Sequence, residues 1–287
     1  MIRLALSDLD DTLIPYGQGR ASDRSIAAIR RVNAIPGLVA GPISGRTIGM
    51  MSWMFEADAA DCFSTGIFVN GQVVRLRGEV ILREAPSRDT LDALADYLKE
   101  VEGEGVALTL YDDEVEGREI CVGTTTEQMA RHPKAFHAFH LASEHVPEGL
   151  FVKTNIHCDR PRPRVERLRD DLTRRFPELS FVFPNPTSST IDITPAGVTK
   201  MTGLQCLMDR MGIGLEEVCV FGDSENDMAI IEGVPNSVAV ANATPQVAAA
   251  ARWHIGPANQ DAVAQALEDI ADAAEKNELP SFIQSTR

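Results

Sequence analysis

Carboxylates follow directly after an apolar run at the start of the chain, in the segment Ser7-Asp8-Leu9-Asp10-Asp11-Thr12. The preceding run, residues 2–6, is typical of a strand buried in a parallel sheet. Ligands of such sheets bind beyond the carboxyl ends of the strands. Neighbouring carboxylates repel one another unless a cation or a shared proton compensates. We therefore expect a hard cation such as Mg²⁺ here, with an acidic helix N-cap as the alternative interpretation.

A second acidic cluster follows another short apolar run late in the chain. Residues 218–221 lead into Gly222-Asp223-Ser224-Glu225-Asn226-Asp227. Two strands that each end in carboxylates fit one divalent metal held between them. Two further polar segments complete the set: Ile43-Ser44-Gly45-Arg46, which follows the apolar residues 38–40, and Gly197-Val198-Thr199-Lys200.

These four motifs, in this order and with a long insert between the second and third, resemble the haloacid dehalogenase superfamily. The branch they resemble is the Cof-like subfamily IIB with a large C2-type cap, and the resemblance covers residues 2–270. It implies an α/β fold with a Rossmann-like three-layer core, a parallel sheet and an inserted α+β cap. The implied division is residues 1–83 and 190–287 for the catalytic core and residues 84–189 for the cap that selects the substrate.

The resemblance also implies a function, namely a Mg²⁺-dependent phosphatase of small phosphomonoesters such as sugar phosphates. Asp8 would form an aspartyl phosphate, and Asp10 would act as general acid and then general base. The implied metal ligands are Asp8, Asp10 through its backbone carbonyl, Asp223 and Asp227. The implied substrate- and phosphate-binding residues are Leu9, Ser44, Gly45, Arg46, Lys200 and Asn226.

The sequence is also compatible with other functions and with ordinary structural roles for the motif residues. A phosphomutase of the same superfamily would return the phosphoryl group to the substrate, and a non-catalytic protein would only bind phosphorylated metabolites. Ser44 and Asp223 could be helix N-caps, and Lys200 could be a surface lysine. Asp11 stands where the family often has glycine, which adds negative charge beside the site.

The composition limits the classes of partner and the location that we expect for this protein. A net charge of −15 argues against nucleic acid or an anionic membrane surface as a partner. No stretch approaches the roughly 20 apolar residues of a membrane span, and the first residues do not read as a signal peptide. The five cysteines are scattered and indicate buried thiols in a reducing compartment. We expect a cytoplasmic protein whose partner is a small phosphorylated metabolite, while the oligomeric state stays open.

Four further expectations concern individual elements and the boundary of the insert. Pro42 lies inside the expected second strand, where it could not donate to a central ladder. Asn70-Gly71 between apolar runs predicts a tight hairpin turn. The spacing after Glu127 predicts a helix to about Ser143 that would carry His137 and His140 on one solvated face, with a zinc site as the alternative. We expect the chain to leave the core near Arg83 and to return near Ser189.

Overall fold

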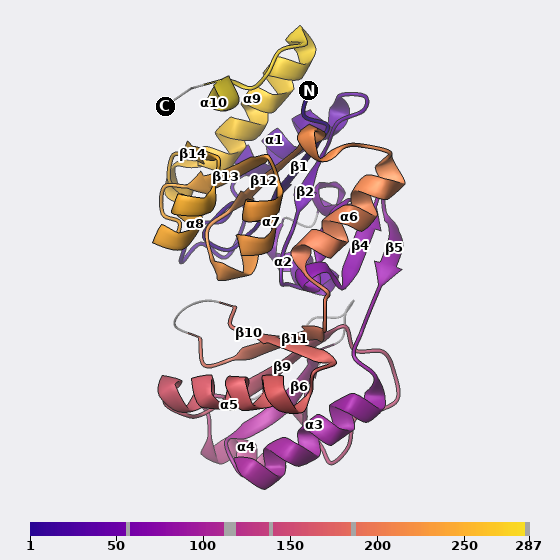
Figure 1. Cartoon of the computed structure of the whole chain (residues 1–287), viewed down its shortest axis with the longest axis vertical. Helices are drawn as coiled ribbons and strands as arrows, with labels where there is room; N and C mark the ends of the chain where they lie inside the picture. Colours follow the sequence, from indigo (N-terminus) through magenta and orange to yellow (C-terminus); the bar gives the residue numbers. More distant parts are fainter. Residues whose placement is uncertain (56–57, 112–118, 138–139, 185–187, 285–287) are drawn as a thin grey trace. The chain divides into compact units, whose positions relative to one another are not determined.

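The computed structural model describes residues 1–55, 58–111, 119–137, 140–184 and 188–284, which form two compact units (Figure 1). The first unit comprises Met1–Leu82 and Thr199–Arg287, and the second comprises Arg83–Val198. Within the described ranges, none of the helices combines the length and the apolar character that a membrane crossing requires.

The first unit is built on a five-stranded parallel sheet with the order β14-β13-β12-β1-β2. Its strands are β1 (Leu4–Ser7), β2 (Val39–Pro42), β12 (Val218–Gly222), β13 (Asn236–Val240) and β14 (Trp253–Ile255). The first strand of the chain lies between β2 and β12, with Leu4 opposite both Val39 and Val218. The two expected carboxylate-bearing strands are therefore neighbours, although most of the chain separates them.

Helices cover both faces of this sheet. On one face, β1 and β12 pack their apolar side chains against α6 (Lys200–Met211) and α7 (Met228–Gly233). On the other face lie α1 (Asp23–Ala34) and α9 (Ala262–Lys276), which pack against each other (Figure 1). The remaining helices of the unit are α2 (Ile48–Met54), α8 (Pro245–Ala250) and α10 (Ser281–Gln284). The helix–sheet–helix layers confirm the expected Rossmann-like core.

Strand β2 tolerates Pro42 because β2 is the edge of the sheet. The N–H of Val39 donates to Arg3 O, just before β1, and that of Ile43 donates to Ser7 O at the end of β1. The alternate residues Ala40 and Pro42 therefore direct their backbone groups away from β1. The free edge at Ala40 is closed by the side chain of Asn33, which bonds both the N–H and the C=O of Ala40. The missing N–H of the proline therefore faces away from β1, the strand with which β2 pairs in this sheet, as is usual for edge prolines.

The expected hairpin is present, but its turn is longer than the two residues predicted. Strands β3 (Gly66–Phe68) and β4 (Val73–Leu76) pair antiparallel, and β5 (Glu79–Arg83) completes a three-stranded sheet. Gly71 in the turn has a φ of 105°, and a Cβ built on it would lie 2.0 Å from the carbonyl oxygen of Thr199. The turn backbone therefore packs directly on the start of α6, which only glycine allows.

The second unit has its own sheet and core, as expected for an α+β insert. Its six strands have the order β10-β11-β9-β6-β7-β8 and are antiparallel except for the β7–β8 pair. Their bounds are β6 (Val106–Tyr111), β7 (Glu119–Val122), β8 (Leu141–Ser143), β9 (Lys153–Cys158), β10 (Leu179–Val182) and β11 (Ile191–Pro195). Helices α3 (Arg88–Val101) and α5 (Arg162–Arg175) bury their apolar stripes against one face of this sheet.

Two expectations for this insert are wrong. The predicted helix ends early, because α4 (Thr126–Arg131) stops before Pro133, whose ring and missing N–H oppose a helix interior. His140 is consequently not on a solvated helix face; its side chain is buried and contacts Glu119 at 2.8 Å. The chain also returns later than Ser189, because β11 pairs with both β9 and β10 and so belongs to the insert.

Candidate active site

Asp8 and Asp223 lie at the carboxyl ends of two neighbouring strands. The backbone N–H of Asp8 donates to Phe221 O at 3.0 Å, which continues the β1–β12 ladder into the first acidic motif. The hydroxyl of Thr12 donates to Asp223 Oδ1 at 2.9 Å and ties the two acidic motifs together. Parallel pairing of the two strands thus explains why carboxylates from opposite ends of the chain meet.

Asp227 joins these two carboxylates through the loop that follows β12. Its Oδ2 accepts hydrogen bonds from the N–H groups of Asp223 (3.0 Å) and Ser224 (3.2 Å). Gly222 makes room for this arrangement, because a Cβ built there would lie 2.7 Å from Asp227 Cγ. Carboxylate oxygens of Asp8, Asp223 and Asp227 lie within 4.8 Å of one another, and all three residues are buried.

Lys200 is fully buried among these carboxylates. Its Nζ lies 2.7 Å from Asp8 Oδ1 and 2.5 Å from Asp227 Oδ1. Lys200 is the first residue of α6, whose N-cap is Thr199, and the Gly71 turn packs on that N-cap. The hairpin and the helix therefore fix the lysine in place, and the interpretation of Lys200 as a surface residue is wrong.

Burial and the neighbouring charges both shift the pKa values of this group. Burial raises the pKa of Asp8 well above its usual range, although Lys200 opposes the shift. Burial and the charge of Asp227 raise the pKa of Asp223 to about 7. Burial alone would lower the pKa of Lys200, but Asp227 and Asp8 outweigh that effect and raise it. Burial is thus the main cause of the raised pKa values of the two aspartates, and the neighbouring carboxylates cause the raised pKa of the lysine.

The donor set of this cluster fits a hard divalent cation. Three carboxylates and one ammonium leave an excess of two negative charges in a buried site. A divalent cation cancels that excess, and carboxylate oxygens are the ligands that Mg²⁺ and Ca²⁺ prefer in proteins. The cluster can therefore hold a metal, and it is the only group of this kind within the described ranges.

Asp10 lies beside this cluster but directs its carboxylate elsewhere. Its two oxygens accept from Nε and Nη2 of Arg46, both at 2.7 Å, and its side chain is 56% exposed. The guanidinium of Arg46 also lies 5.2 Å from the ring centroid of Trp53. The Asp10 side chain is thus not among the grouped carboxylates.

The other expected binding residues lie in the loops at this edge of the sheet. Ser44 follows β2 and is 1% exposed; its Oγ accepts from the N–H of Arg46 at 3.3 Å. A Cβ on Gly45 would lie 3.0 Å from the side chain of Asn70, so the backbone at Gly45 closely approaches Asn70. Asn226 accepts from the hydroxyl of Ser224 at 2.9 Å. The side chain of Leu9 is buried in the core, so only its backbone is available to a ligand.

Sequence reasoning missed three residues that shape the site. Gly222 and Gly71 provide space, which their neighbouring motifs do not reveal. Asn242 donates to Asp11 O at 2.7 Å and accepts from the N–H of Ala258 at 2.8 Å. It thereby ties the loop after β1, where Asp11 adopts a φ of 60°, to a distant segment. The close contacts at the two glycines and the hydrogen bonds of Asn242 arise only when distant segments pack together, so the sequence does not display them.

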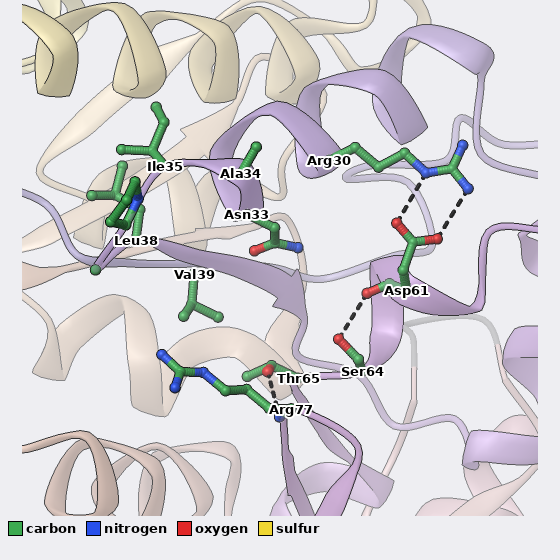
Figure 2. Close-up of a pocket in the computed structure, with 12 residues that line it drawn as sticks. Arg30, Asn33, Ala34, Ile35, Leu38, Val39, Asp61, Ser64, Thr65 and Arg77 are labelled. Atoms are coloured by element: carbon green, nitrogen blue, oxygen red, sulfur yellow. Dashed lines mark hydrogen bonds and ion pairs between the residues drawn. The ribbon is translucent and has the colours of Figure 1, made fainter.

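A hollow of about 620 Å³ on the first unit lies elsewhere (Figure 2). Leu38 and Val39 line it where β2 begins, whereas the acidic cluster follows the strand ends. Its prominent cation, Arg30, is bound by both oxygens of Asp61 at 2.9 and 3.0 Å. This hollow is therefore separate from the candidate active site.

Comparisons with known proteins agree with this geometry. The sequence profile of the haloacid dehalogenase-like hydrolases matches residues 5–267. The chain is 40% identical over 81 residues to a phosphoglycolate phosphatase of Methanothermobacter thermautotrophicus, a match that covers 28% of this chain and only 37% of that protein. It is 25% identical over 263 residues to an HMP-PP phosphatase of Enterobacter sp., covering 87% of this chain and 88% of the relative.

A solved structure supports the same fold. The HAD subclass IIB sugar phosphatase BT4131 superposes with a TM-score of 0.72 at 20% identity, covering 93% of this chain and 98% of that one. A profile match across most of the sequence, together with acidic motifs that the parallel sheet brings to one edge, leads to one conclusion: this chain belongs to the haloacid dehalogenase-like hydrolases.

Proposed function

We propose that this protein is a Mg²⁺-dependent phosphatase of small phosphomonoesters, sugar phosphates or related metabolites, with an aspartyl-phosphate intermediate on Asp8. The observation that carries the proposal is a buried aspartate, Asp8, held by a buried lysine beside two further carboxylates. The names of the relatives, which include a phosphoglycolate phosphatase and an HMP-PP phosphatase, support a small phosphorylated substrate.

In the first step, a carboxylate oxygen of Asp8 attacks phosphorus as the bond to the leaving oxygen breaks, and Asp10 protonates that oxygen. In the second step, Asp10 takes a proton from water, which attacks the same phosphorus, releases phosphate and restores Asp8. Dividing one hard displacement into two is the advantage of a carboxylate nucleophile. Asp10 must exchange its contacts with Arg46 for the leaving oxygen, and its exposed position favours that exchange.

The residues around Asp8 and Asp10 would compensate charge and position the substrate. Lys200 fixes the rotamer of Asp8 and reduces its repulsion from a dianionic phosphate. Asp8, Asp223, Asp227 and the carbonyl of Asp10 would hold Mg²⁺, which when bound supplies positive charge to the phosphoryl oxygens. The Ser44 hydroxyl, the backbone of Leu9 and Gly45, and the side chains of Arg46 and Asn226 would bind the phosphoryl group or the substrate. We further propose that the insert, which is the second unit, Arg83–Val198, selects the substrate.

The test compares wild type with Asp8→Asn on a panel of phosphorylated metabolites, with Mg²⁺ and with EDTA, measured as phosphate release. Because the amide is a poor nucleophile of similar shape, we expect a loss of at least about a thousandfold. Glu232→Gln, an exposed carboxylate change on α7, is the matched control. A near-wild-type rate for Asp8→Asn, or full activity in EDTA, would refute the mechanism, and an isomerised product without phosphate release would indicate a mutase.

A further inference from the structure

The turn of residues 69–71, between β3 and β4, has an unusual backbone conformation. Val69, Asn70 and Gly71 all have positive φ values, of 51°, 55° and 105°. Glycine and asparagine adopt positive φ values most readily, whereas for a β-branched residue such as valine they are a rare outlier. Val69 and Asn70 are also buried, at 1% and 7% exposure. Backbone strain of this kind persists only where the surrounding structure enforces it, and it is concentrated at functional sites.

One side of this turn holds the loop of residues 44–46, the Ser44 loop. The backbone N–H of Val69 donates to Arg46 O at 3.1 Å, and that of Asn70 donates to Ser44 O at 3.0 Å. Between these two bonds, the Asn70 side chain lies against Gly45, where a Cβ would come within 3.0 Å of Asn70 Oδ1. The turn therefore contacts every residue of the Ser44 loop.

The other side of the turn holds the start of α6. A Cβ built on Gly71 would lie 2.0 Å from Thr199 O and 3.3 Å from the backbone N of Lys200, and these two residues are the N-cap and the first residue of α6. The φ angle of Asn70 is the rotation between the peptide group that bonds Ser44 and the peptide group that leads to Gly71. That one angle therefore relates the position of the Ser44 loop to the position of Lys200.

We propose that Asn70 is a positioning residue of the phosphoryl site. By keeping a left-handed φ, it holds the Ser44 loop and the Lys200 end of α6 in the arrangement that phosphate binding requires. Asparagine suits this role because it accepts the left-handed conformation better than most residues, while its side chain packs on Gly45. The inference rests on the proposed function, which assigns phosphoryl binding to Ser44 and charge compensation to Lys200.

Two variants separate the backbone conformation of Asn70 from its side chain. Both remove the side-chain amide, but Asn70→Ala also disfavours the left-handed φ, whereas Asn70→Gly allows it. The readouts are binding of orthovanadate with Mg²⁺, measured by isothermal titration calorimetry, and kcat/KM for para-nitrophenyl phosphate. We expect Asn70→Ala to lower vanadate affinity and kcat/KM about tenfold each. Asn70→Gly should stay within about threefold of wild type in both.

A double variant tests whether Asn70 acts through the Ser44 loop. In a Ser44→Ala background, Asn70→Ala should lower vanadate affinity by a smaller factor than it does in wild type, because the hydroxyl that it positions is absent. A general loss of stability would not produce this coupling. Equal factors in the two backgrounds would overturn the inference.

Two controls measure the effect of destabilisation alone. Arg77→Ala changes another non-glycine residue of positive φ, at 50° in the turn between β4 and β5. Ile270→Val shortens a buried side chain of α9. Both should keep the wild-type vanadate affinity and kcat/KM even where they lower Tm. Affinity losses that follow Tm across the controls and the Asn70 variants would overturn the inference.

The remaining outcomes separate the inference from the proposed function. Wild-type affinity in Asn70→Ala, or equal losses in Asn70→Ala and Asn70→Gly, would overturn the inference, because the left-handed φ would then have no part in phosphate binding. If Asn70→Ala does not fold, Asn70→Ser provides the same comparison with Asn70→Gly. A wild-type protein that neither binds vanadate nor hydrolyses the ester would instead refute the proposed function.

Discussion

Replacing Lys200 by Met should destabilise the metal-free protein strongly, because it removes the only cation among three buried carboxylates. Each hydrogen bond from the ammonium to a carboxylate contributes about 1.5–3 kcal/mol, and Lys200 makes one to Asp8 and one to Asp227. Two such bonds give about 3–6 kcal/mol, which agrees with the roughly 3–5 kcal/mol typical of breaking a buried ion pair. We therefore expect a loss of about 4 kcal/mol in the free energy of unfolding.

Urea unfolding in EDTA, followed by circular dichroism, measures this loss. Lys99→Met, at an exposed position near the end of α3, is the matched control and should stay within about 0.5 kcal/mol of wild type. The double variant Lys200→Met/Asp227→Asn should lose less than the sum of its single variants, because each single variant leaves a partner uncompensated. A loss below about 1 kcal/mol for Lys200→Met, or strict additivity in the double variant, would refute the reasoning.

Three further outcomes follow from the site. With para-nitrophenyl phosphate, Asp10→Asn should release a burst of about one nitrophenol per enzyme and then stall, because the amide cannot activate water. If the variant slows equally on para-nitrophenyl phosphate and on a sugar phosphate and shows no burst, the acid–base role of Asp10 is contradicted. Gly222→Ala should lower the free energy of unfolding by about 1–3 kcal/mol in urea titrations, because the added Cβ meets Asp227, and an unaltered midpoint would argue against the contact. Since the pKa of Asp223 rises to about 7 in the fold, the metal-free protein should lose stability as pH rises from about 4 to about 7. Mg²⁺ should therefore raise Tm more at about pH 8 than at about pH 5.5, and thermal melts with equal shifts at both would oppose this.

The part of the fold that sequence predicts well depends on local rules. Apolar runs that end in acidic residues located β1 and β12, and the strand-end rule for parallel sheets accounts for the proximity of Asp8 and Asp223. Ser22, a residue type that favours helix N-caps, caps α1 by accepting from the N–H of Ser25. These features depend on a few consecutive residues, and the sequence displays those directly.

Other features depend on partners that the sequence does not display. Pro42 conflicts with a central strand but not with an edge strand, and only the strand order shows that β2 is at an edge. The contact of Asp10 with Arg46 is a choice between side-chain partners, which spacing cannot determine. The helix predicted through His140 does not form, because Pro133 opposes a helix interior. That proline is a local signal in the sequence. β11 belongs to the insert because it pairs with β9 and β10. The residues of β11 alone do not reveal these partners.

The position of β1 between β2 and β12 has a consequence for biosynthesis. The strand is translated before β12, so one of its edges stays open until β12 is made, and Thr12 precedes its partner Asp223 by 211 residues. At about 5–20 residues per second, that interval is about 10–40 s. The insert, which has its own apolar core, is translated in full within it. A nascent chain thus carries an apolar strand with one open edge until β12 is made, and such an edge is a template for pairing with other chains.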